Sequence, residues 1–158
     1  MWLGSYWLNY KTWPWSDLNK AIENSQNSGT QNNGTQLDEK EVQEKQNELF
    51  RQGTMDDLAG KISEISPAEP VLGGKWYVTR FWFVSDRDIY IEYEDGHIMR
   101  RILVKIEGEQ ERPEYKIIAY FEPGENDWIL KSGEDTMFGK PLGLYEFSEE
   151  EQEWVKKN

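Results

Sequence analysis

The chain has 158 residues, the size of one domain with or without a flexible arm. Its net charge of −12 comes from 30 acidic and 18 basic residues spread along the chain, and it argues against nucleic-acid binding, because a protein needs a basic face to bind phosphates. The chain contains no cysteine and one histidine, which excludes disulfides, thiolate-bound metals, cysteine nucleophiles and multi-histidine metal sites.

Four of the eight tryptophans lie close to the N-terminus, at Trp2, Trp7, Trp13 and Trp15. Tryptophan gathers where an apolar ring and a polar edge are both satisfied, as at a membrane–water interface. These residues either fold back onto the domain or form an interfacial segment beside a membrane anchor that precedes the chain. Within the chain we expect neither a spanning helix nor a signal peptide, because no apolar run approaches the ~20 residues of a spanning helix.

Composition divides the chain into three parts. We expect an aromatic-rich arm with a short helix over 1–23, a flexible polar linker over 24–36 and a single α+β domain over 37–158. Ser16 can cap the short helix. The linker contains only Asn, Ser, Gln, Gly and Thr, and such a segment buries too little apolar surface to offset the entropy of ordering it.

The first part of the domain predicts two helices separated by Gly53. The stretch up to Gln52 is rich in Glu, Lys and Gln, which favours a surface helix, and Gly53 suits its C-terminal end. A second helix begins at Thr54, because its apolar residues recur every three or four positions. Pro67 and Pro70 end the helical region. The expected buried face of the second helix is Met55, Leu58, Ile62 and Ile65.

From Lys75 the period of the apolar residues changes from about four to two, which predicts a twisted antiparallel meander sheet of about five to six strands. Residues 75–84 are apolar on both faces and are expected to form an interior strand. Ser148, followed by three glutamates, is typical of the start of a short C-terminal helix. The other expected strands lie at 89–94, 97–107, 115–122, 127–131 and near 143–147.

The strongest hairpin signal is Asp95–Gly96, between the second and third expected strands. One face of this hairpin is expected to be core, with Arg100 in its midst, and the other face is expected to be largely solvated. A two-residue turn pairs Glu94 with His97, Tyr93 with Ile98, Ile91 with Arg100 and Ile89 with Ile102. The expected core face consists of Ile89, Ile91, Tyr93, Ile98, Ile102 and Val104. The expected solvated face consists of Asp88, Tyr90, Glu92, Glu94, His97, Met99, Arg101, Leu103 and Lys105.

Arg80 and Arg100 are the candidate ligand-binding residues, because the strand pattern points both toward apolar faces. An arginine that faces inward is costly to bury without a partner. Such an arginine either binds a carboxylate ligand, with Trp82 or Tyr93 stacking beside it, or extends over the core to an internal acid or to solvent. Arg80 is expected to share a strand face with Trp76, Val78 and Trp82.

Motifs that carry catalysis are missing. The chain contains no Gly-rich phosphate-binding loop and no GxSxG elbow, and Asp86 and Asp88 lack the ligand spacing of a calcium loop. His97 follows the hairpin turn beside Asp95, where it is either a carboxylate-tuned proton acceptor or a solvated turn residue. We therefore expect no catalytic residue, no metal site and no cofactor.

The order of helices, antiparallel meander and closing helix predicts an α+β fold. Its topology is similar to cystatin-like and nuclear-transport-factor-like folds, in which a curved sheet wraps a helix. We expect a non-enzymatic extracytoplasmic or surface domain, held near a membrane by its aromatic N-terminus, that binds another protein. The alternatives are a small acidic cytoplasmic inhibitor acting by charge complementarity, and a small-molecule pocket protein or enzyme using Arg80, Arg100 and nearby acids.

Overall fold

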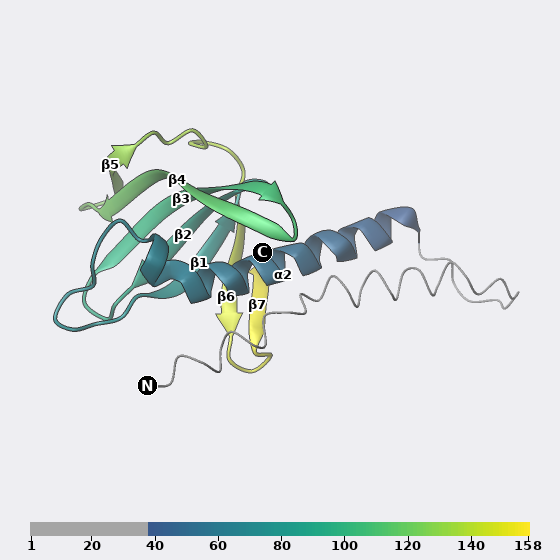
Figure 1. Cartoon of the computed structure of the whole chain (residues 1–158), viewed down its shortest axis with the longest axis horizontal. Helices are drawn as coiled ribbons and strands as arrows, with labels where there is room; N and C mark the ends of the chain where they lie inside the picture. The colour runs from purple at the N-terminus through teal and green to yellow at the C-terminus, as the bar shows by residue number, and fades with distance from the viewer. Residues whose placement is uncertain (1–37) are drawn as a thin grey trace, which may run out of the picture. The chain divides into compact units, whose positions relative to one another are not determined.

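The structure, a computed structural model, describes residues 38–158 (Figure 1). The expected aromatic arm, short helix and polar linker lie outside the described residues. The chain divides into two compact units, Met1–Leu49 and Phe50–Asn158. The boundary falls within helix α2 (Glu39–Ile65), so the first unit is described only by the beginning of this helix.

Helix α2 is continuous, and the predicted break at Gly53 is wrong. A glycine inside a helix costs about 1 kcal/mol relative to alanine. Burial of the residues around Gly53 offsets this cost, because Phe50, Thr54 and Met55 are all buried. The predicted apolar face is confirmed by the burial of Met55, Leu58 and Ile62, and the helix ends at Ile65, before Pro67.

The second unit contains one antiparallel sheet of seven strands, in the order β5-β4-β3-β2-β1-β6-β7. The α+β class is confirmed, but the described chain has one helix instead of several and more strands than expected. The strands are β1 (Tyr77–Phe83), β2 (Asp88–Glu94), β3 (Met99–Glu109), β4 (Arg112–Pro123), β5 (Trp128–Gly133), β6 (Gly143–Ser148) and β7 (Glu153–Lys157).

The strand order places β1 inside the sheet. Strands β1 to β5 form a meander, in which each pairs with the next, whereas β6 pairs with β1 on the side away from β2. The prediction that residues 75–84 form an interior strand is therefore confirmed. The position of β1 between two neighbouring strands explains why both of its faces are apolar. Because β5 lies at one edge, residues 134–142 must cross the sheet to reach β6.

The β2–β3 hairpin has a four-residue loop, so the predicted register is wrong by two residues. The carboxylate of Asp95 accepts the backbone amides of His97 and Ile98 at 2.8 and 2.9 Å, which stabilises the longer loop. Because the shift is even, each side chain stays on its predicted face. The observed pairs include Glu94 with Met99, Tyr93 with Arg100, Ile91 with Ile102 and Ile89 with Val104.

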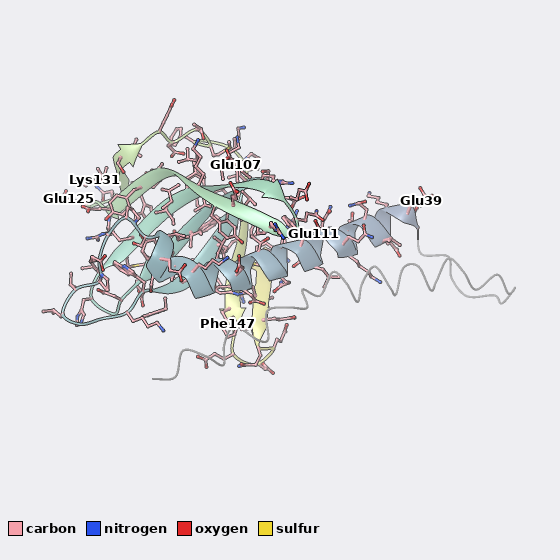
Figure 2. The ribbon with its side chains drawn as sticks, viewed as in Figure 1. Glu39, Glu107, Glu111, Glu125, Lys131 and Phe147 are labelled. Carbon is pink, nitrogen blue, oxygen red and sulfur yellow. The ribbon has the colours of Figure 1, made fainter. Side chains whose placement is uncertain are left out.

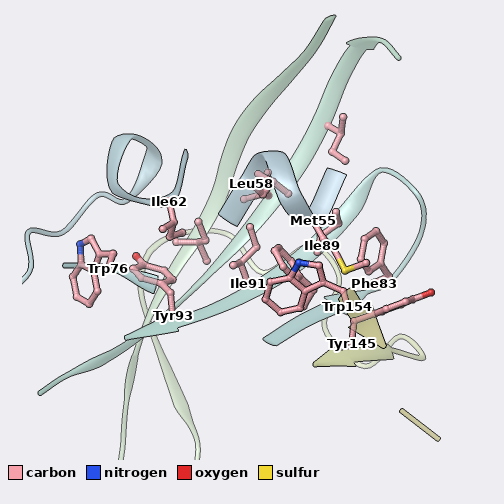
Figure 3. Packing of buried hydrophobic residues seen from close by; sticks show 14 of the residues in the cluster. Met55, Leu58, Ile62, Trp76, Phe83, Ile89, Ile91, Tyr93, Tyr145 and Trp154 are labelled. Carbon is pink, nitrogen blue, oxygen red and sulfur yellow. The ribbon is translucent and has the colours of Figure 1, made fainter. Parts of the chain in front are cut away.

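The main core lies between the sheet and the second-unit part of α2, which crosses one face of the sheet (Figure 1). Figure 3 shows Leu58 and Ile62 of the helix above Ile91 of β2. We call this side of the sheet the helix face. The expected core residues of the hairpin are confirmed, since Ile89, Ile91, Tyr93, Ile102 and Val104 are fully buried and Ile98 packs against them.

The C-terminal helix predicted from Ser148 does not form, and β7 takes its place. Ser148 Oγ does accept the amide of Glu151 at 3.2 Å, as a helix cap would. Gln152, however, has a φ of 56°, which ends the turn. Trp154 is buried in the main core and packs edge-on against Phe81, with 4.7 Å between ring centroids. Burying this tryptophan favours the strand over a surface helix.

The face opposite the helix is not largely solvated, and this prediction is wrong for its centre. Tyr90, Glu92 and Leu103 are buried there. The segment 134–142 crosses this face on its way from β5 to β6 and is held to it by Asp135, which accepts a hydrogen bond from the Tyr90 hydroxyl. A second apolar cluster results, made of Tyr90, Leu103, Ala119 and Phe121, with Trp82, Val84, Ile118, Trp128 and Met137 packed against it.

A β-bulge in β1 separates residues that were expected to share one face. The register shifts between Val78 and Arg80, so the side chains reverse sides at this point. Trp76 and Val78 pack into the main core, whereas Trp82 packs against the second cluster and Arg80 lies on the same side as Trp82. The expectation that these four residues share a face is therefore wrong.

Candidate functional site

Four charged side chains gather on the face opposite the helix, and we call them the arginine–glutamate cluster: Arg80, Glu92, Arg101 and Glu146. Glu92 lies in the middle of β2 and is only 4% exposed. Its partners across the ladder are Arg80 on β1 and Arg101 on β3. Arg101 donates to Glu92 Oε1, and Arg80 Nη1 lies 3.4 Å from Glu92 Oε2. Arg80 Nε donates to Glu146 Oε1 at 2.8 Å.

Aromatic rings surround Arg101. Its guanidinium carbon lies 4.5 Å from the centre of a Trp128 ring and 5.9 Å from that of Tyr90, both of which are cation–π distances. The hydroxyl of Tyr90 donates to Asp135, and burial together with this hydrogen bond raises the pKa of Tyr90 well above its usual value. Tyr90 therefore keeps its proton and ties the segment 134–142 to the sheet.

The arginine–glutamate cluster links strands β3, β2, β1 and β6. A buried carboxylate is costly unless it is paired, and both oxygens of Glu92 face a guanidinium group. Two donors on this face, Trp82 Nε1 and Arg101 Nε, are buried without a hydrogen-bond partner among the described residues. The cluster is thus built chiefly to join strands.

The structure separates the predicted site residues into two pairs on opposite faces. Arg80 and Trp82 lie on the face opposite the helix, whereas Arg100 and Tyr93 are cross-strand partners on the helix face. The four residues therefore do not form one site. Each arginine has a carboxylate partner. Arg80 pairs with Glu92 and Glu146 as described above, and Arg100 Nε lies 3.8 Å from Oε1 of the half-exposed Glu122.

The surroundings of Arg100 and Tyr93 are structural contacts of the core. Arg100 Nη1 donates to the Met99 carbonyl at 2.7 Å. The Tyr93 hydroxyl lies 2.8 Å from Ser66 Oγ, and its ring packs edge-on against Trp76 at 4.9 Å. Burial raises the pKa of Tyr93 to about 12. The expectation that Tyr93 or Arg100 binds a ligand remains untested.

His97 lies in the β2–β3 loop, where its backbone amide binds Asp95. Asp95 also accepts the amides of Ile98 and Val71. Desolvation acts to raise the pKa of Asp95, but the hydrogen bonds from Ile98, Val71 and His97 outweigh it and hold that pKa below the usual value. Asp95 therefore organises the loop. Within residues 38–158, no group of three or more His, Asp and Glu side chains is placed to hold a metal ion.

Four exposed apolar side chains lie on β5 or in the segment that follows it in the chain, and we call them the β5 surface: Ile129, Leu130, Phe138 and Leu142. Phe138 is 83% exposed. Half of the large hydrophobic residues that are exposed in the described part of the chain belong to this surface. Single exposed apolar residues are common on proteins, so what distinguishes this stretch is the near-complete exposure of Phe138 and the number of exposed apolar residues between positions 129 and 142.

Sequence reasoning missed the two features that shape the face opposite the helix. Glu92 interrupts the apolar run 89–93, and a lone acid inside such a run is a signal for a buried ion pair. The β5 surface has no comparable signal, because segment 134–142 reads as an ordinary polar loop whose path depends on where β6 pairs.

No helix of residues 38–158 combines the length and apolarity needed to cross a bilayer. Comparison of the chain with protein-family models, with curated proteins and with solved structures finds no match. The likeness in topology to cystatin-like and nuclear-transport-factor-like folds stays a prediction.

Proposed function

We propose that this chain is a non-enzymatic domain that binds another protein through the β5 surface. The observation that carries the proposal is the exposure of Phe138, together with three further exposed apolar residues between positions 129 and 142. Keeping a phenylalanine in water forfeits roughly 1.5–3 kcal/mol of burial free energy, which binding to a partner recovers. Aromatic anchors of this kind contribute strongly to protein–protein affinity.

The segment that carries Phe138 is anchored to the sheet just before this residue and forms a turn around it. Asp135 binds the Tyr90 hydroxyl and Met137 packs into the second apolar cluster, while the amide of Lys140 donates to the Met137 carbonyl at 3.2 Å. Gly139, with a φ of 76°, turns the chain directly after Phe138. A side chain held outward on an anchored turn loses little entropy on binding, which favours a recognition role.

Peptide selection on the immobilised full chain tests this proposal, with a display library of random linear peptides as the probe. We expect enriched peptides to bind the double variant Phe138→Ser/Leu142→Ser about tenfold more weakly, since two apolar anchors are lost. Leu72→Ser is the matched control, because Leu72 is 86% exposed but lies far from β5 in the sequence. Equal binding to the double variant, or no enrichment over a blank surface, contradicts the proposal.

We further propose that the domain is held at a membrane surface on the extracytoplasmic side by its N-terminal aromatic residues. The support is the sequence alone, in which Trp2, Trp7, Trp13 and Trp15 are closely spaced. Flotation with phosphatidylcholine vesicles tests this tether. We expect the full chain to float with the vesicles and the variant with these four residues replaced by serine to remain behind, whereas equal flotation of both contradicts it.

The β3–β4 hairpin supports the acidic inhibitor as a second candidate function. Its turn is flanked by exposed glutamates at Glu107, Glu109, Glu111 and Glu114, and Figure 2 shows Glu107 and Glu111 on this hairpin. Such a group of charges favours a basic partner and fast association at low salt. If this function holds, replacing the four glutamates by glutamine lowers the association rate with that partner, whereas the β5 surface variant leaves the rate unchanged.

A further inference from the structure

Strand β5 is an edge strand with one unpaired side. Within residues 38–158 it ends the strand order and pairs with β4 alone. The amide of Gly124 donates to the Asp127 carbonyl at 2.7 Å, so these two residues form a hydrogen-bonded pair beside the β4–β5 turn. Alternation along the ladder then points the backbone groups of Trp128 and Leu130 away from β4. Asp127 Oδ1 accepts the Trp128 amide at 2.7 Å, which leaves the Trp128 carbonyl and both Leu130 groups available.

An added strand would find apolar side chains on both faces of this edge. Leu130 pairs with Phe121, which belongs to the cluster opposite the helix, so its side chain lies on that face. Ile129 pairs with Glu122 and lies on the helix face. Leu130 and Ile129 are 44% and 48% exposed, and cross-strand apolar pairs are the main stabilising contacts between neighbouring strands.

The negative charge around β5 favours an added strand that carries positive charge. Residues 122–135 carry five acids and one base, a net charge of −4. Glu125 and Glu134 are exposed at the two ends of β5, and Figure 2 shows Glu125 and Lys131 projecting from this part of the sheet. The single base, Lys131, lies 3.7 Å from Glu122 Oε2. A second copy of this chain would bring the same negative charge, so a basic segment fits better.

We propose that β5 binds an extended basic segment of a partner protein, in which two successive apolar residues are flanked by Lys or Arg, as an additional strand of the sheet. This inference rests on the proposed protein-binding function and adds the mode of binding. Backbone hydrogen bonds to Leu130 and Trp128 supply affinity, and the side chains of Ile129 and Leu130 select apolar residues at two successive positions of the added strand, one on each face of the sheet.

Leu130→Pro tests the proposal, because proline removes the outward amide and spares the ladder to β4. Leu130→Ala is the matched control, which shortens the side chain but keeps the amide. We expect peptides selected on the full chain to carry net positive charge, to bind more weakly at high salt and to bind Leu130→Pro about tenfold more weakly than Leu130→Ala. Peptide binding should also slow hydrogen exchange of the Leu130 amide in the unmodified chain.

Three results would overturn the proposal. If Leu130→Pro binds the peptides as tightly as Leu130→Ala, or if the Leu130 amide gains no protection, strand addition is wrong. Loss of binding in Phe138→Ser/Leu142→Ser would then still support the proposed function, so the two failures are distinguishable. If sedimentation shows a dimer of the chain that Leu130→Pro converts to monomer, the edge binds a second copy and the basic partner is wrong.

Discussion

Replacing Glu92 by leucine would leave two arginines facing each other across β2 without their shared carboxylate. Arg101 is the more affected of the two, because its side chain is 22% exposed and its contact with Glu92 is direct. Arg80 is 44% exposed and keeps its hydrogen bond to Glu146. The perturbation therefore removes one largely buried ion pair and weakens one that solvent already screens.

The expected loss of unfolding free energy follows from these two contacts. Removing one partner of a fully buried pair costs about 3–5 kcal/mol, and exposure of Arg80 reduces its share, so Glu92→Leu should cost about 2–3 kcal/mol. Glu92→Gln keeps the shape and one acceptor oxygen and should cost about 1–2 kcal/mol. Glu114→Gln, at an exposed position of β4, should stay within about 0.5 kcal/mol of the parent.

Urea unfolding followed by tryptophan fluorescence measures these differences. The double variant Glu92→Leu/Arg101→Met should recover at least about 1 kcal/mol relative to the sum of the single variants, because it removes the unpaired charge together with its partner. If Glu92→Leu is as stable as the parent, or if the double variant shows no coupling, Glu92 does not hold the strands together and the reasoning is refuted.

Three further predictions concern backbone space, the C-terminus and alkaline stability. Gly133→Ala should lower the free energy of unfolding in urea by about 3 kcal/mol, because an added Cβ would lie 2.0 Å from the Ile118 carbonyl oxygen. Gly139→Ala is the control, because Gly139 has the same φ of 76° but free space around it, and it should cost about 1 kcal/mol. Trp154→Ala should cost about 3–5 kcal/mol, and a loss below that of Phe147→Ala, at an exposed position, would contradict the place of β7 in the core. Because burial raises the pKa of Tyr93 from 10.0 to about 12, the folded state holds this proton more tightly than the unfolded state, so its contribution to stability is complete below pH 10 and declines from there through pH 12. Absorbance at ~295 nm should show this late ionisation in the parent and lose it in Tyr93→Phe, and ionisation of Tyr93 at its usual pH would refute its burial.

The helix and most strands could be predicted because their signals are local. The apolar period of Met55, Leu58 and Ile62 requires only neighbouring turns of one helix. The loop at Asp95–Gly96 was also found, but its length was not, because the choice between two and four residues depends on hydrogen bonds that the Asp95 side chain makes within the loop. Local patterns likewise favoured a helix at Ser148, where burial of Trp154 requires a strand.

The candidate site likewise combines features that the sequence predicts with features that depend on the tertiary structure. The sequence predicts that Arg80 and Arg100 need carboxylate partners, and each arginine has one in the structure. The bulge in β1, which the sequence does not reveal, places the two arginines on opposite faces of the sheet. The β5 surface became visible only in the structure, because its exposure depends on the path of the chain from β5 to β6.

By itself, the sequence determined the acidic charge, the absence of cysteine-dependent chemistry, and the pattern of apolar residues that produces a sheet packed on a helix. The tertiary structure alone decided which face of the sheet is covered by residues 134–142, how Glu92 becomes buried and which edge of the sheet stays open. The physical reason is the distance along the chain over which each kind of interaction acts. Periodicity and turn chemistry act between residues a few positions apart, whereas burial and edge exposure are set by strand pairings between residues far apart in the chain.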